Sequence, residues 1–185
     1  MVIQNEKYKI VIKIDESYTI ESADNQHYDL VINPLGYKRN DLHRTFNITI
    51  EKNDEIIKIA LIGDFYAYDT DCAILEGNIL VVLQNNKISQ INIDECCLIE
   101  HKKFDCIGCN FGIYKVNNGY IIYGEIEILM LDFDFCKKWS FLGRDIFVSQ
   151  FREKPFEICD NLIRLYDWED NYYEIDFDGN LLTDN

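Results

Sequence analysis

Apolar and polar residues alternate along most of this chain with a period of two. Residues 9–14, Lys-Ile-Val-Ile-Lys-Ile, are typical of the pattern. A period of two places successive side chains on opposite faces of an extended strand, and helical spacing is almost absent. We therefore expect strands at residues 9–14, 47–50, 55–62, 79–83, 88–93, 120–123, 126–133, 162–166 and 172–177.

Turn-forming residues separate these segments. Asn, Asp and Gly favour tight turns because their side chains bond the local backbone or because they tolerate positive φ. Short strands joined by such turns predict an all-β fold. The turns are expected at Gly77-Asn78, Asn85-Asn86, Asn117-Asn118-Gly119, Asp160-Asn161 and Asp178-Gly179-Asn180.

Three segments of the chain repeat one another. They begin at Cys72, Gly112 and Pro155, and in each the third strand ends in the tetrad apolar-x-apolar-Asp. The terminal residues Asp94, Asp134 and Asp178 are expected to form turns through their carboxylates. Weaker copies of the tetrad occur at residues 12–15 and 48–51. We expect the apolar tetrad residues to be buried, namely Ile91, Ile93, Leu131, Phe133, Ile175 and Phe177.

These repeats, spaced by roughly 40 residues, resemble the blades of β-propellers, each a four-stranded antiparallel sheet. The resemblance covers the chain from Cys72 onward, without a Trp-Asp dipeptide or paired-Gly signature. It implies a propeller-like fold of repeated four-stranded antiparallel units. A β-sandwich, or a β-meander packed on a partial propeller, is the alternative.

The expected organisation is one all-β domain over residues 1–185. Residues 1–70 would form an irregular N-terminal β region, and residues 71–185 would form three blade-like repeats. Residues 9–15 would lend a strand that closes the ring, because an unclosed sheet leaves exposed edges.

The charge of the chain narrows the possible partners. It has 33 acidic and 18 basic residues, a formal net charge of −15. Direct nucleic-acid binding is disfavoured because phosphate contacts require clustered Lys and Arg, whereas a basic protein partner is favoured. The chain has no apolar run of the ~18 residues that a membrane helix needs, so no membrane partner is expected. Seven cysteines without a framework are typical of reduced thiols, which predicts a cytoplasmic location, and frequent Ile, Asn and Lys fit a bacterial origin.

Cysteines are concentrated between residues 96 and 109. A zinc site built from His101, Cys106 and Cys109 is the alternative that this spacing raises. A structural zinc site normally has a second ligand pair, and a thioredoxin-like pair opens a helix, which this chain lacks. We therefore interpret the cysteines as structural and expect no metal and no cofactor.

Sequence motifs for catalysis are missing. The chain has no glycine-rich phosphate loop, no G-x-S-x-G and no H-E-x-x-H. We assign no catalytic residue and favour a non-enzymatic protein. The alternative is a small-molecule-binding or hydrolytic propeller-like protein.

Acidic and aromatic residues coincide in two segments that we predict to form a binding face. Tyr and Trp provide large contact area with little loss of rotamer freedom, and carboxylates attract a basic partner. The alternative is that these aromatic residues pack within the sheets. The candidate binding residues are Asp64, Tyr66, Tyr68, Asp69, Asp71, Asp167, Trp168, Glu169 and Asp170.

In charge and size, the chain resembles bacterial immunity proteins, which neutralise toxins. This resemblance is one of general character and involves no motif. It implies a non-enzymatic, acidic protein-binding domain that captures a basic partner.

Overall fold

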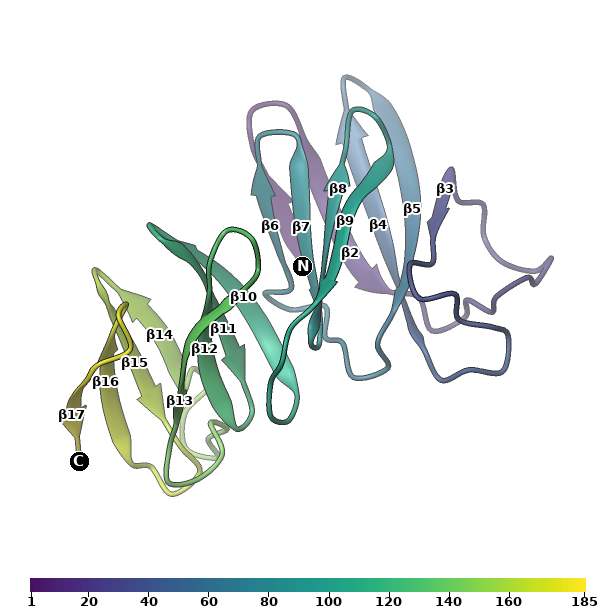
Figure 1. Ribbon diagram of the computed structural model, residues 1–185. Helices are drawn as coiled ribbons and strands as arrows, with labels where there is room; N and C mark the ends of the chain where they lie inside the picture. Colours follow the sequence, from purple (N-terminus) through teal and green to yellow (C-terminus); the bar gives the residue numbers. More distant parts are fainter. The chain divides into compact units, whose positions relative to one another are not determined.

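The computed structural model describes residues 1–185 and contains strands and turns but no helix (Figure 1). No helix is therefore long and apolar enough to cross a membrane. The all-β prediction is confirmed. The chain divides into two compact units, Met1–Lys103 and Phe104–Asn185. Each unit contains two sheets, and the interpretation of residues 1–185 as one domain stays a prediction.

The first sheet occupies the region expected to be irregular. Its strands lie in the order β1-β2-β4-β5-β3, and only the pairing of β3 with β5 is parallel. The strands are β1 (Val2–Gln4), β2 (Lys9–Ile14), β3 (Leu30–Ile32), β4 (Arg44–Lys52) and β5 (Glu55–Gly63). The expectation that residues 9–15 close a ring of blades is wrong, because β2 pairs on both sides within this sheet.

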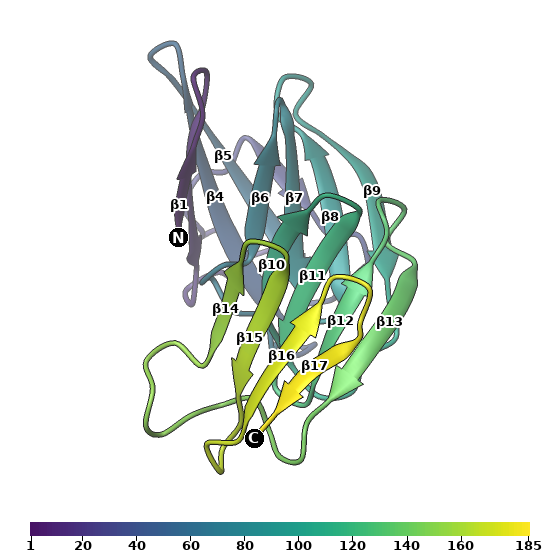
Figure 2. The same ribbon diagram turned by 90° about the vertical axis from the view of Figure 1, so that its left-hand side faces the viewer.

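The other three sheets are four-stranded antiparallel meanders, in which each strand pairs with the next along the chain. Figure 2 shows the last of them, β14 to β17, face-on. This repeated connectivity is that of propeller blades, as the resemblance implied. The second sheet contains β6 (Ala73–Glu76), β7 (Ile79–Gln84), β8 (Lys87–Asn92) and β9 (Cys97–Lys103). The third contains β10 (Asn110–Val116), β11 (Gly119–Gly124), β12 (Glu127–Leu131) and β13 (Lys137–Leu142), and the fourth β14 (Phe156–Cys159), β15 (Leu162–Tyr166), β16 (Tyr172–Asp176) and β17 (Leu181–Asp184).

The sequence repeat is also a repeat of local geometry. In each of these sheets the pairing of the third and fourth strands shifts register immediately before the tetrad, at Gln90/Ile91, Met130/Leu131 and Glu174/Ile175. In every copy the extra residue lies on the fourth strand, at Ile99, Lys138 and Leu182, so the bulge bends that strand shortly after the turn.

The turn that follows is formed by the second residue of the tetrad, and not by the terminal Asp as predicted. Asp132 Oδ1 accepts hydrogen bonds from the backbone N–H groups of Asp134 and Cys136, at 3.0 and 2.8 Å. Asp176 and Asn92 accept corresponding bonds in their own turns. The correction has a simple reason: a side-chain oxygen reaches the N–H two residues later, so the bonding residue precedes the turn.

The burial of the tetrads follows the prediction at four of six positions. Ile91, Ile93, Leu131 and Ile175 are buried, but Phe177 is only half-buried and Phe133 is 49% exposed. The prediction for Phe133 is wrong because this residue lies in the turn after β12, where strand alternation no longer applies. Its ring contacts the edge of Tyr120 instead, with centroids 5.7 Å apart.

Each unit has a core between the inward faces of its two sheets. In the first unit, Ile10, Phe46 and Ile48 of the first sheet share one cluster with Leu80 and Ile91 of the second. In the second unit, residues from β11 and β12 meet others from β15 and β16. Each fully buried Ile contributes roughly 1.5–3 kcal/mol, so these clusters hold the sheets in place and fix the loops at their ends.

Candidate functional site

The first candidate site is the loop between β5 and β6, residues 64–71, which we call the aromatic loop. Its aromatic side chains face solvent: Phe65 is 42% exposed, Tyr66 57% and Tyr68 39%. The rings of Phe65 and Tyr66 meet edge to face with centroids 5.6 Å apart. The interpretation of Tyr66 and Tyr68 as core residues is therefore wrong.

The carboxylate of Asp64 fixes the start of the aromatic loop. Its Oδ1 accepts the backbone N–H of Tyr66 at 2.9 Å, and its Oδ2 pairs with Lys87 Nζ at 2.6 Å. Burial opposes ionisation of Asp64, but these bonds outweigh it and hold the pKa of the carboxyl below its usual value. The loop begins as an ordered turn.

Two further contacts hold the rest of the aromatic loop. Arg44 Nη1 donates to the carbonyl of Ala67 at 2.7 Å, and its guanidinium lies 5.2 Å from the centroid of the Phe65 ring. Asp69 Oδ2 accepts the backbone N–H of Ile14 at 3.1 Å. Asp71 is exposed with a positive φ of 48°. The exposed rings are thus carried by a constrained backbone.

A groove of about 320 Å³ adjoins the aromatic loop, and we call it the acidic groove. Its lining residues come from three separate segments of the chain, so no single sequence motif predicts the groove. Three carboxylates and one guanidinium line it, which leaves an excess of negative charge. The lining residues are Ile14, Asp15, Glu16, Tyr18, Asp41, Leu42, His43, Arg44, Thr45 and Phe65.

Asp15 supplies a permanent negative charge at the acidic groove. Its Oδ1 accepts the N–H and the hydroxyl of Ser17, and its Oδ2 accepts Gln26 Nε2 and the hydroxyl of Tyr28 at 2.6 Å. Burial opposes ionisation, but these four bonds lower the pKa of Asp15 to about 2. No Lys or Arg forms a hydrogen bond or ion pair with it.

The second predicted segment, the turn between β15 and β16, uses its first carboxylate internally. Asp167 is fully buried. It accepts hydrogen bonds from the backbone of Glu169 and Asn171, from the Asn171 side chain and from the Tyr173 hydroxyl at 2.7 Å. Burial opposes its ionisation, but these bonds hold its pKa below the usual value. The expectation that Asp167 faces a partner is wrong, because its oxygens are engaged inside the turn.

The other members of this turn are at the surface. Trp168 is 41% exposed, and Glu169 is exposed. Asp170 pairs with Arg152 through two bonds of 2.8 and 3.2 Å, and the same guanidinium lies 3.6 Å from the centroid of the Tyr166 ring. Trp168 remains a candidate contact residue, and Asp170 already has a cation.

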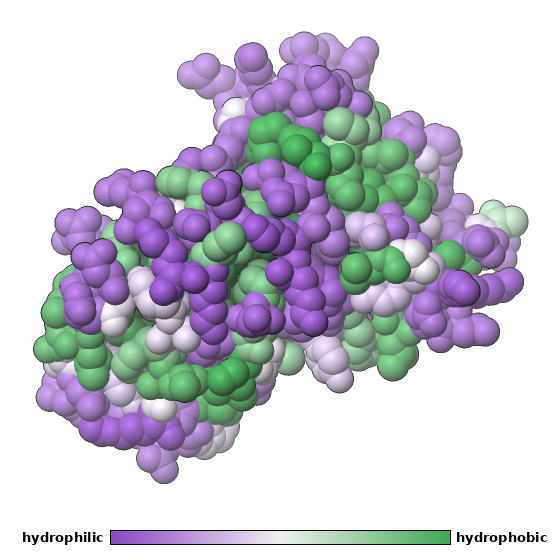
Figure 3. All heavy atoms as spheres, in the orientation of Figure 1, coloured by the Kyte–Doolittle hydropathy of each residue, from purple (hydrophilic) through white to green (hydrophobic).

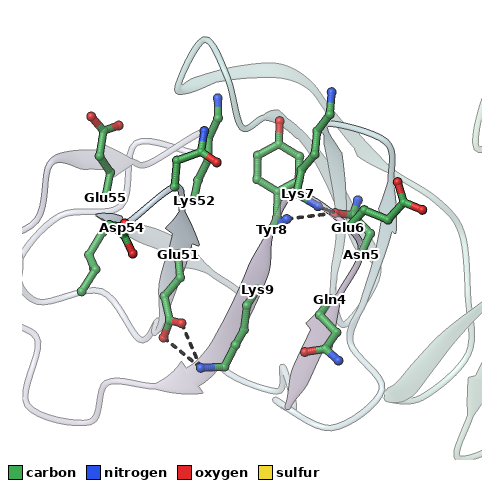
Figure 4. A pocket seen from close by; sticks show the side chains of 12 residues that line it. Gln4, Asn5, Glu6, Lys7, Tyr8, Lys9, Glu51, Lys52, Asp54 and Glu55 are labelled. Atoms are coloured by element: carbon green, nitrogen blue, oxygen red, sulfur yellow. Dashed lines mark hydrogen bonds and ion pairs between the residues drawn. The ribbon is translucent and has the colours of Figure 1, made fainter.

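Two hollows larger than the acidic groove lie at the opposite end of the β4–β5 hairpin from the aromatic loop. Their volumes are about 470 and 520 Å³, and both are lined by the turn from Asn5 to Tyr8; Figure 4 shows the residues that line the first. Lys9 pairs with Glu51 at 2.9 Å, and Asp94 accepts the Tyr8 hydroxyl at 2.7 Å and pairs with Lys52. Two lysines at these hollows, Lys9 and Lys52, thus have carboxylate partners. The acidic groove, in contrast, is lined by carboxylates that form no ion pair with a Lys or Arg.

All seven cysteines are free thiols. Cys106 and Cys109 lie in the connector before β10, and Asn110 Nδ2 donates to Cys106 Sγ at 3.1 Å. His101 lies in β9 with Nδ1 2.9 Å from the Ser89 hydroxyl, and burial lowers its pKa while raising that of Cys106. No group of three or more His, Cys, Asp or Glu side chains is placed to hold a metal ion.

One face of the molecule shows how exposed hydrophobic residues are distributed. Figure 3 shows one face of the molecule, on which hydrophilic residues predominate and hydrophobic residues form separate patches. Scattered apolar residues are normal at protein surfaces. The aromatic loop differs because consecutive rings are exposed on a backbone that is held in place.

Comparison with known proteins identifies the fold and no family. No protein-family model and no curated protein matches the sequence. The computationally designed protein Ika8 is structurally similar, with a TM-score of 0.53 and 10% identity over 78% of this chain and 46% of that chain. BamB from Moraxella catarrhalis also matches, with a TM-score of 0.48 and 11% identity over 83% of this chain and 48% of that chain. The WD40 domain of SCAP from fission yeast matches with a TM-score of 0.45 and 10% identity over 95% of this chain and 48% of that chain.

This chain spans about half the length of the solved chains that it matches. At such low identity the likeness concerns the fold alone. The strand connectivity defines an all-β chain of repeated four-stranded antiparallel sheets of the propeller-like class.

Proposed function

We propose that this chain is a non-enzymatic protein-binding domain that captures a basic partner through the aromatic loop. The observation that carries the proposal is the exposure of Phe65, Tyr66 and Tyr68 on a loop held by Asp64, Arg44 and Asp69. Holding aromatic rings in water does not stabilise the fold. On a binding surface, the same rings are available to contact a partner.

Aromatic side chains dominate the energetics of protein interfaces. Binding also costs the entropy of ordering the loops and side chains that form the interface. The contacts of the aromatic loop reduce this cost before a partner arrives. Tyr66, the most exposed of the rings, is the expected anchor.

The partner is expected to be basic. The chain carries a net charge of −15, and the acidic groove adjoins the aromatic loop. Charges around an interface accelerate encounter with an oppositely charged partner and disfavour partners of like charge. In its narrower form, the proposal is that the partner is a basic toxin, which the chain neutralises as an immunity-type protein.

A selected-peptide experiment tests the proposal. We would select ligands from a library of short random peptides, synthesise the best binder and measure its dissociation constant by fluorescence anisotropy. We expect the selected peptides to be rich in Lys and Arg. Tyr66→Ala should weaken binding by about thirtyfold, as truncation of an aromatic anchor does.

The matched control is Ile56→Ala, which removes another exposed apolar side chain, 62% exposed, from the far end of β5. It should leave the affinity unchanged. Trp168→Ala tests whether the β15–β16 turn contributes a second contact. Selection of peptides without basic residues, or equal affinity of the Tyr66→Ala variant and the wild type, would contradict the proposal.

A further inference from the structure

We propose that the acidic groove is a slot for one cationic side chain of the partner, with a preference for the guanidinium of arginine. This inference rests on the proposed function and adds the chemistry by which the partner is recognised. It concerns the groove rather than the aromatic loop, so the two can fail separately.

The charges of the acidic groove are not balanced within the chain. The carboxylate of Glu16 is exposed and makes no hydrogen bond or ion pair. Asp41 uses one oxygen, Oδ2, to accept the N–H of Lys38 at 2.7 Å. Both oxygens of Asp15 accept hydrogen bonds within the chain, so Asp15 adds negative charge to the groove, with no cation beside it, rather than a free acceptor. The one guanidinium of the lining, that of Arg44, is directed to Ala67 and Phe65.

The walls of the acidic groove suit a flat cation. Tyr18 supplies an aromatic face, Phe65 supplies a second aromatic wall over which Arg44 already lies, and Leu42, 78% exposed, supplies an apolar rim. Tyr18 is held in place by the edge of Tyr28, with centroids 5.8 Å apart. A guanidinium stacks on aromatic faces and is less strongly hydrated than an ammonium, which favours arginine over lysine at such a site.

A buried hydroxyl gives a second, independent indication of a ligand. Thr45 lines the groove, is 2% exposed, and its Oγ1 has no hydrogen-bond partner. The Thr45 side chain lies on the face of β4 opposite to Phe46, which points into the core. Buried hydroxyls are almost always hydrogen-bonded, so an unsatisfied one beside a groove fits a donor supplied by a bound molecule.

The chain itself contains the arrangement that the proposal requires. In the second unit, the guanidinium of Arg152 lies over the ring of Tyr166 and donates two hydrogen bonds to Asp170. An aromatic face and a carboxylate together therefore accept an arginine elsewhere in this protein. The acidic groove offers the same two components in Tyr18 and the carboxylates of Glu16 and Asp41, and no arginine of the chain lies over Tyr18, since Arg44 lies over Phe65.

The test is a titration of the whole chain, followed by the backbone amide signals in NMR spectra. The probes are N-acetyl-arginine amide, its lysine analogue, and the citrulline analogue, which keeps the shape of arginine without its charge. We expect arginine amide to shift the signals of Glu16, Thr45 and Phe65 in a saturable manner. The lysine analogue should bind more weakly, and the citrulline analogue should cause no saturable shift.

The double variant Glu16→Gln and Asp41→Asn should weaken binding of arginine amide by about tenfold, since each exposed charge pair contributes modestly. Glu55→Gln, an exposed carboxylate at the far end of β5, is the matched control and should change nothing. Equal shifts from citrulline and arginine amides, equal binding of the lysine analogue, or an unchanged affinity in the double variant would overturn the inference.

The selected basic peptide separates this inference from the proposed function. If the peptide still binds the double variant with unchanged affinity but loses affinity for Tyr66→Ala, the arginine slot is wrong and the proposed function stands. If Tyr66→Ala has no effect on the peptide, the proposed function fails whatever arginine amide does.

Discussion

The aromatic loop and the β15–β16 turn both have aspartates next to exposed aromatic rings. They differ in whether carboxylates without a cation lie beside them. In the turn, Asp167 is buried and hydrogen-bonded within the chain, and Asp170 is paired with Arg152. In the aromatic loop, Asp64 and Asp69 also hold the backbone, yet carboxylates from other segments line a groove beside it. The comparison shows that a surface that is to attract a charged partner needs carboxylates that are not already bonded within the chain.

The largest expected effect follows from the buried carboxylate of the turn. Asp167→Ala should lower the free energy of unfolding of the second unit by about 3 kcal/mol, because it leaves the Tyr173 hydroxyl and several N–H groups buried without an acceptor. Denaturant unfolding followed by fluorescence measures this loss. A change below about 1 kcal/mol would show that the turn does not depend on Asp167.

The same residue predicts a dependence on pH. The pKa of Asp167 is lower in the folded chain, so its contribution is fully present above the unfolded pKa of about 4 and is lost as the pH falls through the folded pKa. Unfolding at a series of acidic pH values should show the wild type losing more stability than Asp167→Ala. Parallel curves for the two proteins would contradict this assignment.

The second prediction concerns binding and contrasts the two loops directly. Tyr66→Ala should weaken binding of the selected basic peptide by about 2 kcal/mol, whereas Trp168→Ala should cost less than about 1 kcal/mol. The reason is that Tyr66 is the most exposed ring of the loop that adjoins the acidic groove, while Asp170, two residues after Trp168, already has an arginine. Anisotropy titrations with both variants decide it. A larger effect of Trp168→Ala would reverse the comparison.

The third prediction concerns the ion pair that begins the aromatic loop. Asp64→Ala should destabilise the first unit by roughly 1–2 kcal/mol, because Lys87, only 12% exposed, loses its carboxylate partner and the backbone N–H of Tyr66 loses its acceptor. It should also weaken peptide binding, since the loop would have to be ordered on binding. Thermal unfolding and anisotropy provide the two readouts. Unchanged affinity would mean that the loop is not held for binding.

The smallest effect is expected for the corresponding pair in the second unit. Asp170→Ala removes a carboxylate from an exposed pair, with side chains 40% and 38% exposed, and should cost at most about 1 kcal/mol. Added salt should reduce the difference from wild type. A loss as large as that of Asp64→Ala would show that burial does not explain the contrast between the two pairs.

Much of the fold could be predicted because alternation and turn residues act locally. Residues 9–14 and 162–166 were expected as strands and form β2 and β15, and the turns at Asn85 and Asp160 adopt the positive φ that their side chains tolerate. The pairing of β3 with β5 had no local signal, because a parallel partner depends on a long connection.

The candidate site could be predicted only in part. Tyr66 and Tyr68 were among the candidates because aromatic and acidic residues cluster within residues 64–71, whereas the exposed ring of Phe65 was not among them. The acidic groove was missed because Glu16, Asp41 and Phe65 come from separate segments that the fold brings together. Asp167 was assigned to the surface because composition indicates charge, whereas its burial depends on hydrogen bonds that only the folded turn provides.

The central claim is that the aromatic loop, and not the turn with the same sequence character, is the binding surface. Mapping the amide signals of the whole chain during titration with the selected basic peptide tests it most directly. The account predicts that the largest shifts fall on residues 64–71 and on the lining of the acidic groove, and that Tyr66→Ala abolishes them at the same peptide concentration. Largest shifts on residues 167–170, with the aromatic loop unchanged, would contradict it.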